Sequence, residues 1–256
     1  MSTPVNKTNA IIVAAPATEN TDLPIQPAHG TKSLISVNGR PALYYVVENL
    51  RKSDRISKII LVSDEIVREA APNVDVYVDA AGDESASVIA GIREAADASR
   101  CMVMTGDLPL ASTEAIDDLL TYAPTAGVIY PIVEKSDVKA SFPDREAYYI
   151  GTREGKFTGS SCLLFDPQVA LSRESFVISL LNARRDPTLL LGLVGPGLAL
   201  KVMFSNVSVK ELEETLSRVI NAECRVFLSH YPELFISIDS ARDLAIIEQS
   251  LNTYII

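Results

Sequence analysis

The alternation of short apolar runs with amphipathic segments is the feature that most constrains how this chain can fold. Four apolar runs bounded by turn residues predict buried strands, over residues 9–15, 56–62, 73–79 and 101–105. Helices with one apolar face are predicted to start at Pro41, Asp83 and Ser112, the last two as N-cap residues. This order is typical of βαβ units, whose right-handed crossovers place helices on both faces of a mostly parallel sheet.

After a further strand predicted at residues 127–132, the pattern changes. Two apolar segments, residues 148–152 and 157–165, flank a turn that contains Gly155. A turn of this kind between two apolar segments predicts a hairpin. An antiparallel excursion is therefore expected to interrupt the parallel sheet.

Residues 166–222 predict a mainly helical insertion within a single domain that spans residues 1–256. The insertion contains an uncharged stretch, residues 188–200, which Gly195-Pro196-Gly197 interrupts. We expect a buried helical hairpin that turns at these three residues. A lipid- or substrate-facing patch, or an oligomer contact, is the alternative for the same apolar stretch.

The C-terminal part predicts two strands, over residues 225–229 and 234–238, followed by a last helix. Ser240 and Asp243 are suited to cap that helix. The chain is thus expected to return to the sheet before it ends.

Charge and composition exclude several functions. A formal net charge of −10 is a poor match to a polyanion, so general binding to nucleic acid is not expected. The three cysteines are scattered in apolar runs without metal-binding spacing, which indicates reduced core thiols and a cytoplasmic protein. The N-terminal residues lack the apolar core of a signal peptide, and no run is long enough to span a membrane.

Three charged residues follow predicted elements in a way that suggests a common site. Asp107 follows the strand at residues 101–105, Asp239 follows the strand at 234–238, and Lys32 ends the long segment after the first strand. Open α/β sheets bind ligands at the carboxyl ends of their strands. Carboxylates bind Mg²⁺ and a lysine supplies a point charge to phosphate, so the three residues suit phosphoryl-group chemistry.

Several segments resemble those of nucleotidyltransferases related to the molybdenum-cofactor guanylyltransferase. Lys32-Ser33-Leu34 through Gly39-Arg40-Pro41 is similar to the family's K-x-L-x-x-x-x-G-[KR]-P segment. Gly106-Asp107-Leu108-Pro109-Leu110 resembles its G-D-x-P-L, whose Asp binds magnesium, and Ser87-Val88 with Gly91 resembles its S-V-x-x-G-L. Ile238-Asp239 with Asp243-Leu244 resembles its D-[IV]-D-x-x-x-D-L ending.

The resemblance implies a Rossmann-like three-layer α/β/α sandwich of the GT-A type, with a mixed, mostly parallel sheet. It implies transfer of a nucleoside monophosphate from a nucleoside triphosphate to a phosphorylated small-molecule acceptor, with Mg²⁺ as cofactor and pyrophosphate as product. By the same resemblance Lys32 and Asp107 are catalytic and Asp107 and Asp239 hold the metal. The expected substrate contacts are Ala14, Ala15, Lys32, Ser87 and Gly106.

One departure from the family pattern leaves a second function open. Where the family has a short glycine-rich loop after L-A-G-G, this chain has Ala14-Ala15-Pro16 and then only Gly30 before Lys32. Backbone amides that cradle phosphates depend on glycine's freedom, and proline has no amide hydrogen. A catalytically inactive binding or regulatory protein is therefore the main alternative.

A sugar transferase that uses a nucleotide-sugar donor is a third alternative. Such enzymes usually carry an Asp-x-Asp metal motif near the middle of the chain. Asp117-Asp118 lies on a predicted helix and does not fit that motif. We therefore rank this alternative last.

Overall fold

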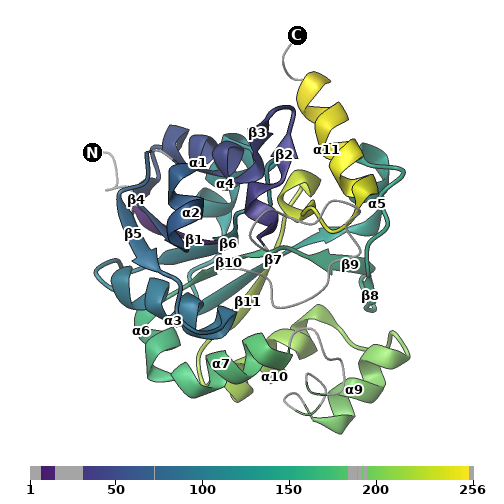
Figure 1. The fold of residues 1–256 in the computed structure, drawn as a ribbon. Coiled ribbons are helices and arrows are strands. Elements are labelled where there is room, and N and C mark those ends of the chain that lie inside the picture. The colour runs from purple at the N-terminus through teal and green to yellow at the C-terminus, as the bar shows by residue number, and fades with distance from the viewer. Residues whose placement is uncertain are drawn as a thin grey trace, which may run out of the picture.

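A nine-stranded mixed sheet lies at the centre of the molecule, with helices on both faces (Figure 1). The computed structural model describes residues 7–14, 31–71, 73–183, 189, 192 and 195–253. The strands are β1 (Thr8–Ala14), β4 (Ile56–Ser63), β5 (Val76–Asp79), β6 (Cys101–Thr105), β7 (Val128–Glu134), β8 (Ile150–Gly151), β9 (Lys156–Gly159), β10 (Cys162–Phe165) and β11 (Cys224–Leu228). A separate hairpin consists of β2 (Ser36–Val37) and β3 (Arg40–Pro41).

The helices follow the strands in chain order. They are the 3₁₀ helix η2 (Lys32–Leu34), α1 (Ala42–Lys52), α2 (Glu65–Glu69), α3 (Glu84–Glu94), α4 (Thr113–Tyr122), α5 (Lys135–Ser141), α6 (Pro167–Ser172), α7 (Glu174–Ala183), α9 (Pro196–Met203), α10 (Val209–Ile220), the 3₁₀ helix η3 (Pro232–Phe235) and α11 (Ala241–Thr253). Within the described residues, no helix combines the length and apolar character that crossing a bilayer requires.

The strand order is β5-β4-β1-β6-β10-β7-β9-β8, with β11 paired to β7. Strands β5, β4, β1 and β6 are parallel, and β10 and β9 are antiparallel to their neighbours. From β1 the chain moves outward to β4 and β5 and then returns to β6 on the other side of β1. The strand order thus reverses between β1 and β6, which is where open sheets of this kind form a ligand crevice.

Alternating strand residues build two apolar layers, one on each face of the sheet. Ile12, Leu61 and Met104 point to the layer that contains α1 and α4. Ile11 and Val62 point to the opposite layer, which contains α3 and α7. Because parallel strands are covered on both faces, their residues form continuous apolar runs, and this confirms the predicted three-layer α/β class.

Four predictions about individual elements need correction. The apolar segment 157–165 is divided at Ser160-Ser161: β9 pairs with the end of β7, whereas β10 pairs with its start and with β6. Residues 234–238 form the end of η3 and an irregular segment instead of a strand. Ile236 and Ile238 are fully buried there, and burial without alternation does not separate strand from other structure.

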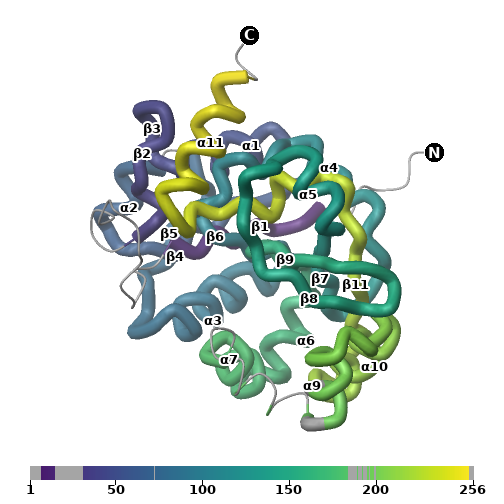
Figure 2. Tube along the Cα trace, turned by 90° about the vertical axis from the view of Figure 1, so that its right-hand side faces the viewer, coloured from purple at the N-terminus to yellow at the C-terminus, as the bar shows by residue number. Residues whose placement is uncertain are grey.

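Pro41 precedes α1 as its N-cap and is not its first helical residue, because it ends the small hairpin β2–β3. Asn38 and Gly39 form the turn of that hairpin with φ angles of 48° and 82°, the left-handed region that an Asn-Gly turn uses. The hairpin stands beside α11 in Figures 1 and 2, where Asn38 donates a hydrogen bond to the carbonyl of Glu248.

The stretch around Gly195-Pro196-Gly197 is not buried as predicted, and most of the first arm of the predicted helical hairpin lies outside the described residues. Gly195 is the N-cap of α9, with a φ angle of 87°, so these residues begin a helix. Leu189 and Leu200 are each 55% exposed, so neither is a core residue. The other residues between 184 and 194, apart from Gly192, lie outside the described part of the chain.

Candidate active site

The site starts where the strand order reverses, between β1 and β6. Val13 pairs with Thr105 in parallel register, so the two strands end side by side. The amide of Gly106 donates to the carbonyl of Val13 at 3.3 Å, which continues the pairing one residue beyond β6. Asp107 therefore leaves the sheet directly at the point where the strand order reverses.

Gly106 allows the Lys32 segment to approach this point. A Cβ atom at Gly106 would lie 2.5 Å from Ser33 Oγ and 3.1 Å from Leu43 Cδ1. The absence of a side chain at position 106 lets η2 pack against the loop after β6. Thr31 fixes the same segment from the other side, because its hydroxyl donates to the carbonyl of Ala14 at 3.4 Å.

Asp239 reaches the same place from the C-terminal part of the chain. The amide of Ile238 donates to the carbonyl of Asp107 at 3.2 Å. Lys32 Nζ lies 2.6 Å from Asp239 Oδ1, with 22% of the lysine side chain and 53% of the aspartate side chain exposed. The structure thus brings together Lys32, Asp107 and Asp239, which the sequence separates by more than 200 residues.

The Asp107 carboxylate occupies an unfavourable environment for a charge. The residue is only 7% exposed, and Oδ1 has no hydrogen-bond partner among the described residues. Burial raises the pKa of Asp107, the nearby charge of Asp239 raises it further, and Thr105 and Lys32 oppose the shift. An inward carboxylate without a partner fits a site that receives a cation.

Asp239 differs from Asp107 in the direction of its pKa shift. Burial acts to raise the pKa of Asp239, but hydrogen bonds from Lys32 and Ser237 and the charge of Arg145 outweigh it. The net result is a lowered pKa, so this carboxylate stays ionised. Ser237 Oγ donates to Asp239 Oδ2 at 2.6 Å, which gives a role to the position where the family pattern has Asp.

The hydrogen-bond partners of Ser87 lie outside the group Lys32, Asp107 and Asp239. Its buried hydroxyl donates to the carbonyl of Asp83 at 2.9 Å and accepts from the amide of Ala81 at 3.0 Å. Ser87 therefore holds the loop between β5 and α3. Gly91 on the same helix allows close packing, because a Cβ there would lie 2.7 Å from Ile11 Cγ2.

Ala14 ends β1 and offers its carbonyl to Thr31, whereas the predicted contact Ala15 lies outside the described residues. The prediction from sequence missed Arg145 and Asp243, which form an ion pair of 2.8 Å next to Asp239. Arg145 lies in a polar connecting segment without periodicity, so no pattern could have indicated it. Asp243 was predicted as a helix cap and as part of the motif that contains Asp239, but not as the partner of an arginine.

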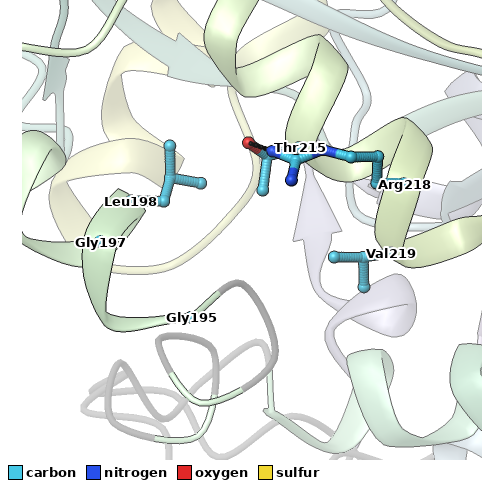
Figure 3. Close-up of a pocket in the computed structure, with 6 residues that line it drawn as sticks. All are labelled: Gly195, Gly197, Leu198, Thr215, Arg218 and Val219. Carbon is cyan, nitrogen blue, oxygen red and sulfur yellow. Dashed lines mark hydrogen bonds between the residues drawn. The ribbon is translucent and has the colours of Figure 1, made fainter.

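A depression lies in the helical part, between α9 and α10 (Figure 3). This open groove has a volume of about 370 Å³ and is lined by Gly195, Gly197, Leu198, Thr215, Arg218 and Val219. Arg218 donates to Thr215 Oγ1 at 3.0 Å and to the carbonyl of Glu214. The lining has no carboxylate to hold a metal, so the groove does not compete with the Lys32 cluster as a site for a metal-bound triphosphate.

Comparison with known families identifies the family of this chain. A model of the MobA-like NTP transferase domain matches residues 28–187, which is more than half of the chain and includes Lys32 and Asp107. The chain belongs to this family. Asp239 lies C-terminal to the matched range, so its place in the site rests on the geometry described above.

Two curated proteins are similar to parts of the chain. The chain is 27% identical over 116 residues to 2-C-methyl-D-erythritol 4-phosphate cytidylyltransferase of Clostridium botulinum, covering 42% of this chain and 52% of that protein. It is 32% identical over 90 residues to a probable molybdenum cofactor guanylyltransferase of Thermococcus kodakarensis, covering 34% and 43%. The chain thus matches about half the length of these relatives.

The structural similarity extends over nearly the whole chain. A hypothetical transferase from Thermus thermophilus superposes with a TM-score of 0.82 at 28% identity, covering 93% of this chain and 99% of that one. The predicted Rossmann-like fold of the GT-A type is thereby confirmed for this chain.

The residues present fit a magnesium ion held by two carboxylates. Among the described residues, no group of three or more His, Cys, Asp or Glu side chains could hold a metal. Mg²⁺ is commonly bound through one or two carboxylates, with substrate phosphates and water as its other ligands. Asp107, with its unpartnered oxygen, and Asp239 suit that arrangement.

Proposed function

We propose that this chain transfers a nucleoside monophosphate from a nucleoside triphosphate to a phosphorylated acceptor and releases pyrophosphate, in a Mg²⁺-dependent reaction. The convergence of Lys32, Asp107 and Asp239 at the reversal of strand order is the observation that carries the proposal. Membership of the MobA-like NTP transferase family supports it.

In the proposed reaction, an oxygen of the acceptor phosphate forms a bond to the α-phosphorus. The bond from the α-phosphorus to the oxygen that bridges to the β-phosphorus breaks, and pyrophosphate leaves with the electron pair. Lys32 neutralises phosphate charge, and Asp107 and Asp239 hold Mg²⁺, which when bound stabilises charge on the phosphate oxygens. The chain thus acts by positioning and charge neutralisation, without a covalent intermediate.

The base and the acceptor stay open. One relative is named a cytidylyltransferase and the other a guanylyltransferase, so the comparisons favour neither base. The predicted substrate contacts Ala14, Ala15, Ser87 and Gly106 stay predictions. The same holds for the cytoplasmic location, for the lack of nucleic-acid binding and for an oligomer contact at residues 188–200.

A panel of nucleotides tests the proposal. Thermal unfolding is measured with CTP, GTP, ATP and UTP, each with and without Mg²⁺. We expect at least one nucleotide to raise the unfolding temperature only when Mg²⁺ is present, since ligands that bind the folded state stabilise it. If no nucleotide changes the unfolding temperature under either condition, the chain is not a nucleotidyltransferase.

Asp107→Asn separates stability from activity. Removal of a buried charge whose desolvation is not fully offset is expected to stabilise the ligand-free protein by about 1–3 kcal/mol at neutral pH. Since the pKa of Asp107 is raised in the folded state, wild type loses stability as pH rises from the ordinary value of 3.8. The extra free energy of unfolding of the variant should therefore vanish below pH 3.8. Denaturant titrations at several pH values measure it.

The same substitution distinguishes an enzyme from an inactive binding protein. That alternative is favoured by Pro16 and the scarcity of glycine before Lys32, where family members are glycine-rich. Once a nucleotide has been identified and an acceptor found, Asp107→Asn should lower pyrophosphate release at least about a hundredfold. Unchanged nucleotide affinity and no measurable turnover in wild type with any acceptor would favour the binding protein.

A further inference from the structure

A buried ion pair next to Asp239 involves two residues that the proposed reaction does not use. Arg145 lies in the segment between α5 and β8, and Asp243 lies in the first turn of α11. They are 6% and 7% exposed, and Arg145 Nη1 is 2.8 Å from Asp243 Oδ1. Because desolvation offsets most of the attraction, an apolar pair at such a place is often equally stable. Stability alone therefore does not explain the pair.

The contacts of this pair point to one short loop. Arg145 Nη1 donates to the carbonyl of Ser237 at 3.1 Å, and Nη2 lies 3.7 Å from Asp239 Oδ2. Asp243 Oδ2 accepts from the amide of Asp239 at 3.3 Å and from Ser240 Oγ at 2.8 Å. Among the described residues, the side-chain hydrogen bonds and ion pairs of these two residues, beyond the bond between them, all reach residues 237–240.

We propose that Arg145 and Asp243 are positioning residues that hold the Asp239 carboxylate in the orientation in which it binds the divalent cation, an inference that rests on the proposed function. Groups that hydrogen-bond to a metal-ligating carboxylate fix its orientation. Arginine suits this role because its planar fork reaches several acceptors at once.

The two oxygens of Asp239 are held from different sides. Oδ2 accepts from Ser237 and lies near Arg145, whereas Oδ1 pairs with Lys32. When Lys32 turns to a phosphate group, Oδ1 becomes available and Oδ2 stays fixed. Asp239 would then offer a single oxygen to the cation. By holding the loop with Oδ2 turned away, Arg145 and Asp243 would thus leave Oδ1 as the oxygen of Asp239 that binds the metal.

Two variants of the full chain test the positioning role, with binding of Mn²⁺ measured by electron paramagnetic resonance. Arg145→Lys keeps the charge but loses the planar fork, and we expect Mn²⁺ to bind about tenfold more weakly. The double variant Arg145→Met with Asp243→Leu replaces the buried charges by apolar groups of similar size. We expect it to unfold at a temperature close to that of wild type, because apolar replacement of a buried pair is tolerated. Its Mn²⁺ affinity should nevertheless fall at least about tenfold.

Arg93→Met is the matched control, because Arg93 forms an ion pair of 2.7 Å with Glu174 on the surface. It should change neither the Mn²⁺ affinity nor the unfolding temperature appreciably. Wild-type Mn²⁺ affinity in Arg145→Lys, or in a folded double variant, would overturn the positioning role and leave the proposed function standing. Wild type that binds no Mn²⁺ would overturn the metal site and the positioning role together, whereas nucleotide binding is tested separately.

Discussion

At the scale of single residues, the ion pair between Lys32 and Asp239 has a chemical consequence. The two groups are 2.6 Å apart, so the lysine occupies the oxygen that a cation would use. An exposed pair of this kind contributes at most about 1 kcal/mol to stability, so a triphosphate can displace it. If Asp239 binds the cation as proposed, Lys32 opposes binding of a cation by itself and favours binding of a cation together with phosphate.

Lys32→Met should change two affinities in opposite directions. Without nucleotide, Mn²⁺ is expected to bind about tenfold more tightly, because a positive charge next to the site is removed. The nucleotide with Mg²⁺ should bind about tenfold more weakly, because the phosphates lose their counter-charge. Both are measured by calorimetry.

Lys58→Met is the control for this substitution, since Lys58 forms a comparable ion pair with Asp97 at 2.8 Å. It should leave both affinities unchanged. If Lys32→Met changes the two affinities in the same direction, Lys32 does not exchange its ion pair with Asp239 for one with phosphate.

Gly106→Ala should destabilise the protein by about 1–3 kcal/mol, because the new methyl group overlaps Ser33 and Leu43. It should also weaken nucleotide binding, since the overlap displaces η2 and with it Lys32. Gly197→Ala in α9 is the matched control: a Cβ there meets nothing within 4 Å, and alanine favours helix. Chemical denaturation compares the two, and equal effects would contradict a packing role for Gly106.

At the scale of elements, hydrogen bonds join the helices α9 and α10 to the turn between β8 and β9. The amide of Arg153 donates to the carbonyl of Val207 at 2.9 Å, and Glu154 accepts from the amide of Val209 at 3.1 Å. Glu211 connects the two helices, because it accepts from Lys201 Nζ at 2.6 Å and from the amide of Ser208 at 2.9 Å. This capping box fixes the start of α10.

Glu211→Gln should lower the unfolding temperature at pH 7. The hydrogen bond from Lys201, together with that from Ser208, lowers the pKa of Glu211 to about 2 in the folded state. A lowered folded-state pKa stabilises the protein above the ordinary value of 4.5, and this contribution declines as pH falls towards 2. The difference between wild type and variant should therefore shrink below pH 4.5. A difference that stays constant between pH 7 and pH 3 would contradict this electrostatic explanation.

At the scale of the whole molecule, the sheet separates two apolar layers that contain Cys162 and Cys101, and Cys224 is buried beside α10. Cys101, Cys162 and Cys224 are free thiols with at most 4% exposure. Burial raises the pKa of Cys101 and of Cys162 to about 12 and also raises the pKa of Cys224. Since the thiolate is the reactive form, the folded protein should be nearly inert towards thiol reagents.

Labelling with a thiol reagent at pH 8 tests this expectation. In native buffer the reaction should proceed only as fast as the protein opens, and all three cysteines should react rapidly in denaturant. Mass spectrometry of digested samples identifies the labelled positions. Rapid labelling of Cys162 in the folded protein would show that the layer around β10 is open to solvent.

The sequence by itself determined the parallel half of the sheet and the class of the fold. Strands buried on both faces need continuous apolar runs, and helices such as α3 and α4 carry their caps, Asp83 and Ser112, within a few residues. Those signals are local, so they can be recognised without knowledge of the rest of the chain. These local signals also predicted that Asp107 lies at the carboxyl ends of the parallel strands.

Tertiary structure alone decided how distant segments meet. The division of residues 157–165 between β9 and β10 depends on which parts of β7 and β6 are free to pair, and an apolar run carries no such information. The contact of Lys32 with Asp239 and the buried pair of Arg145 with Asp243 join residues that are about a hundred or more positions apart. Hydrogen bonds and charge interactions act over a few Å in space, whatever the separation along the chain.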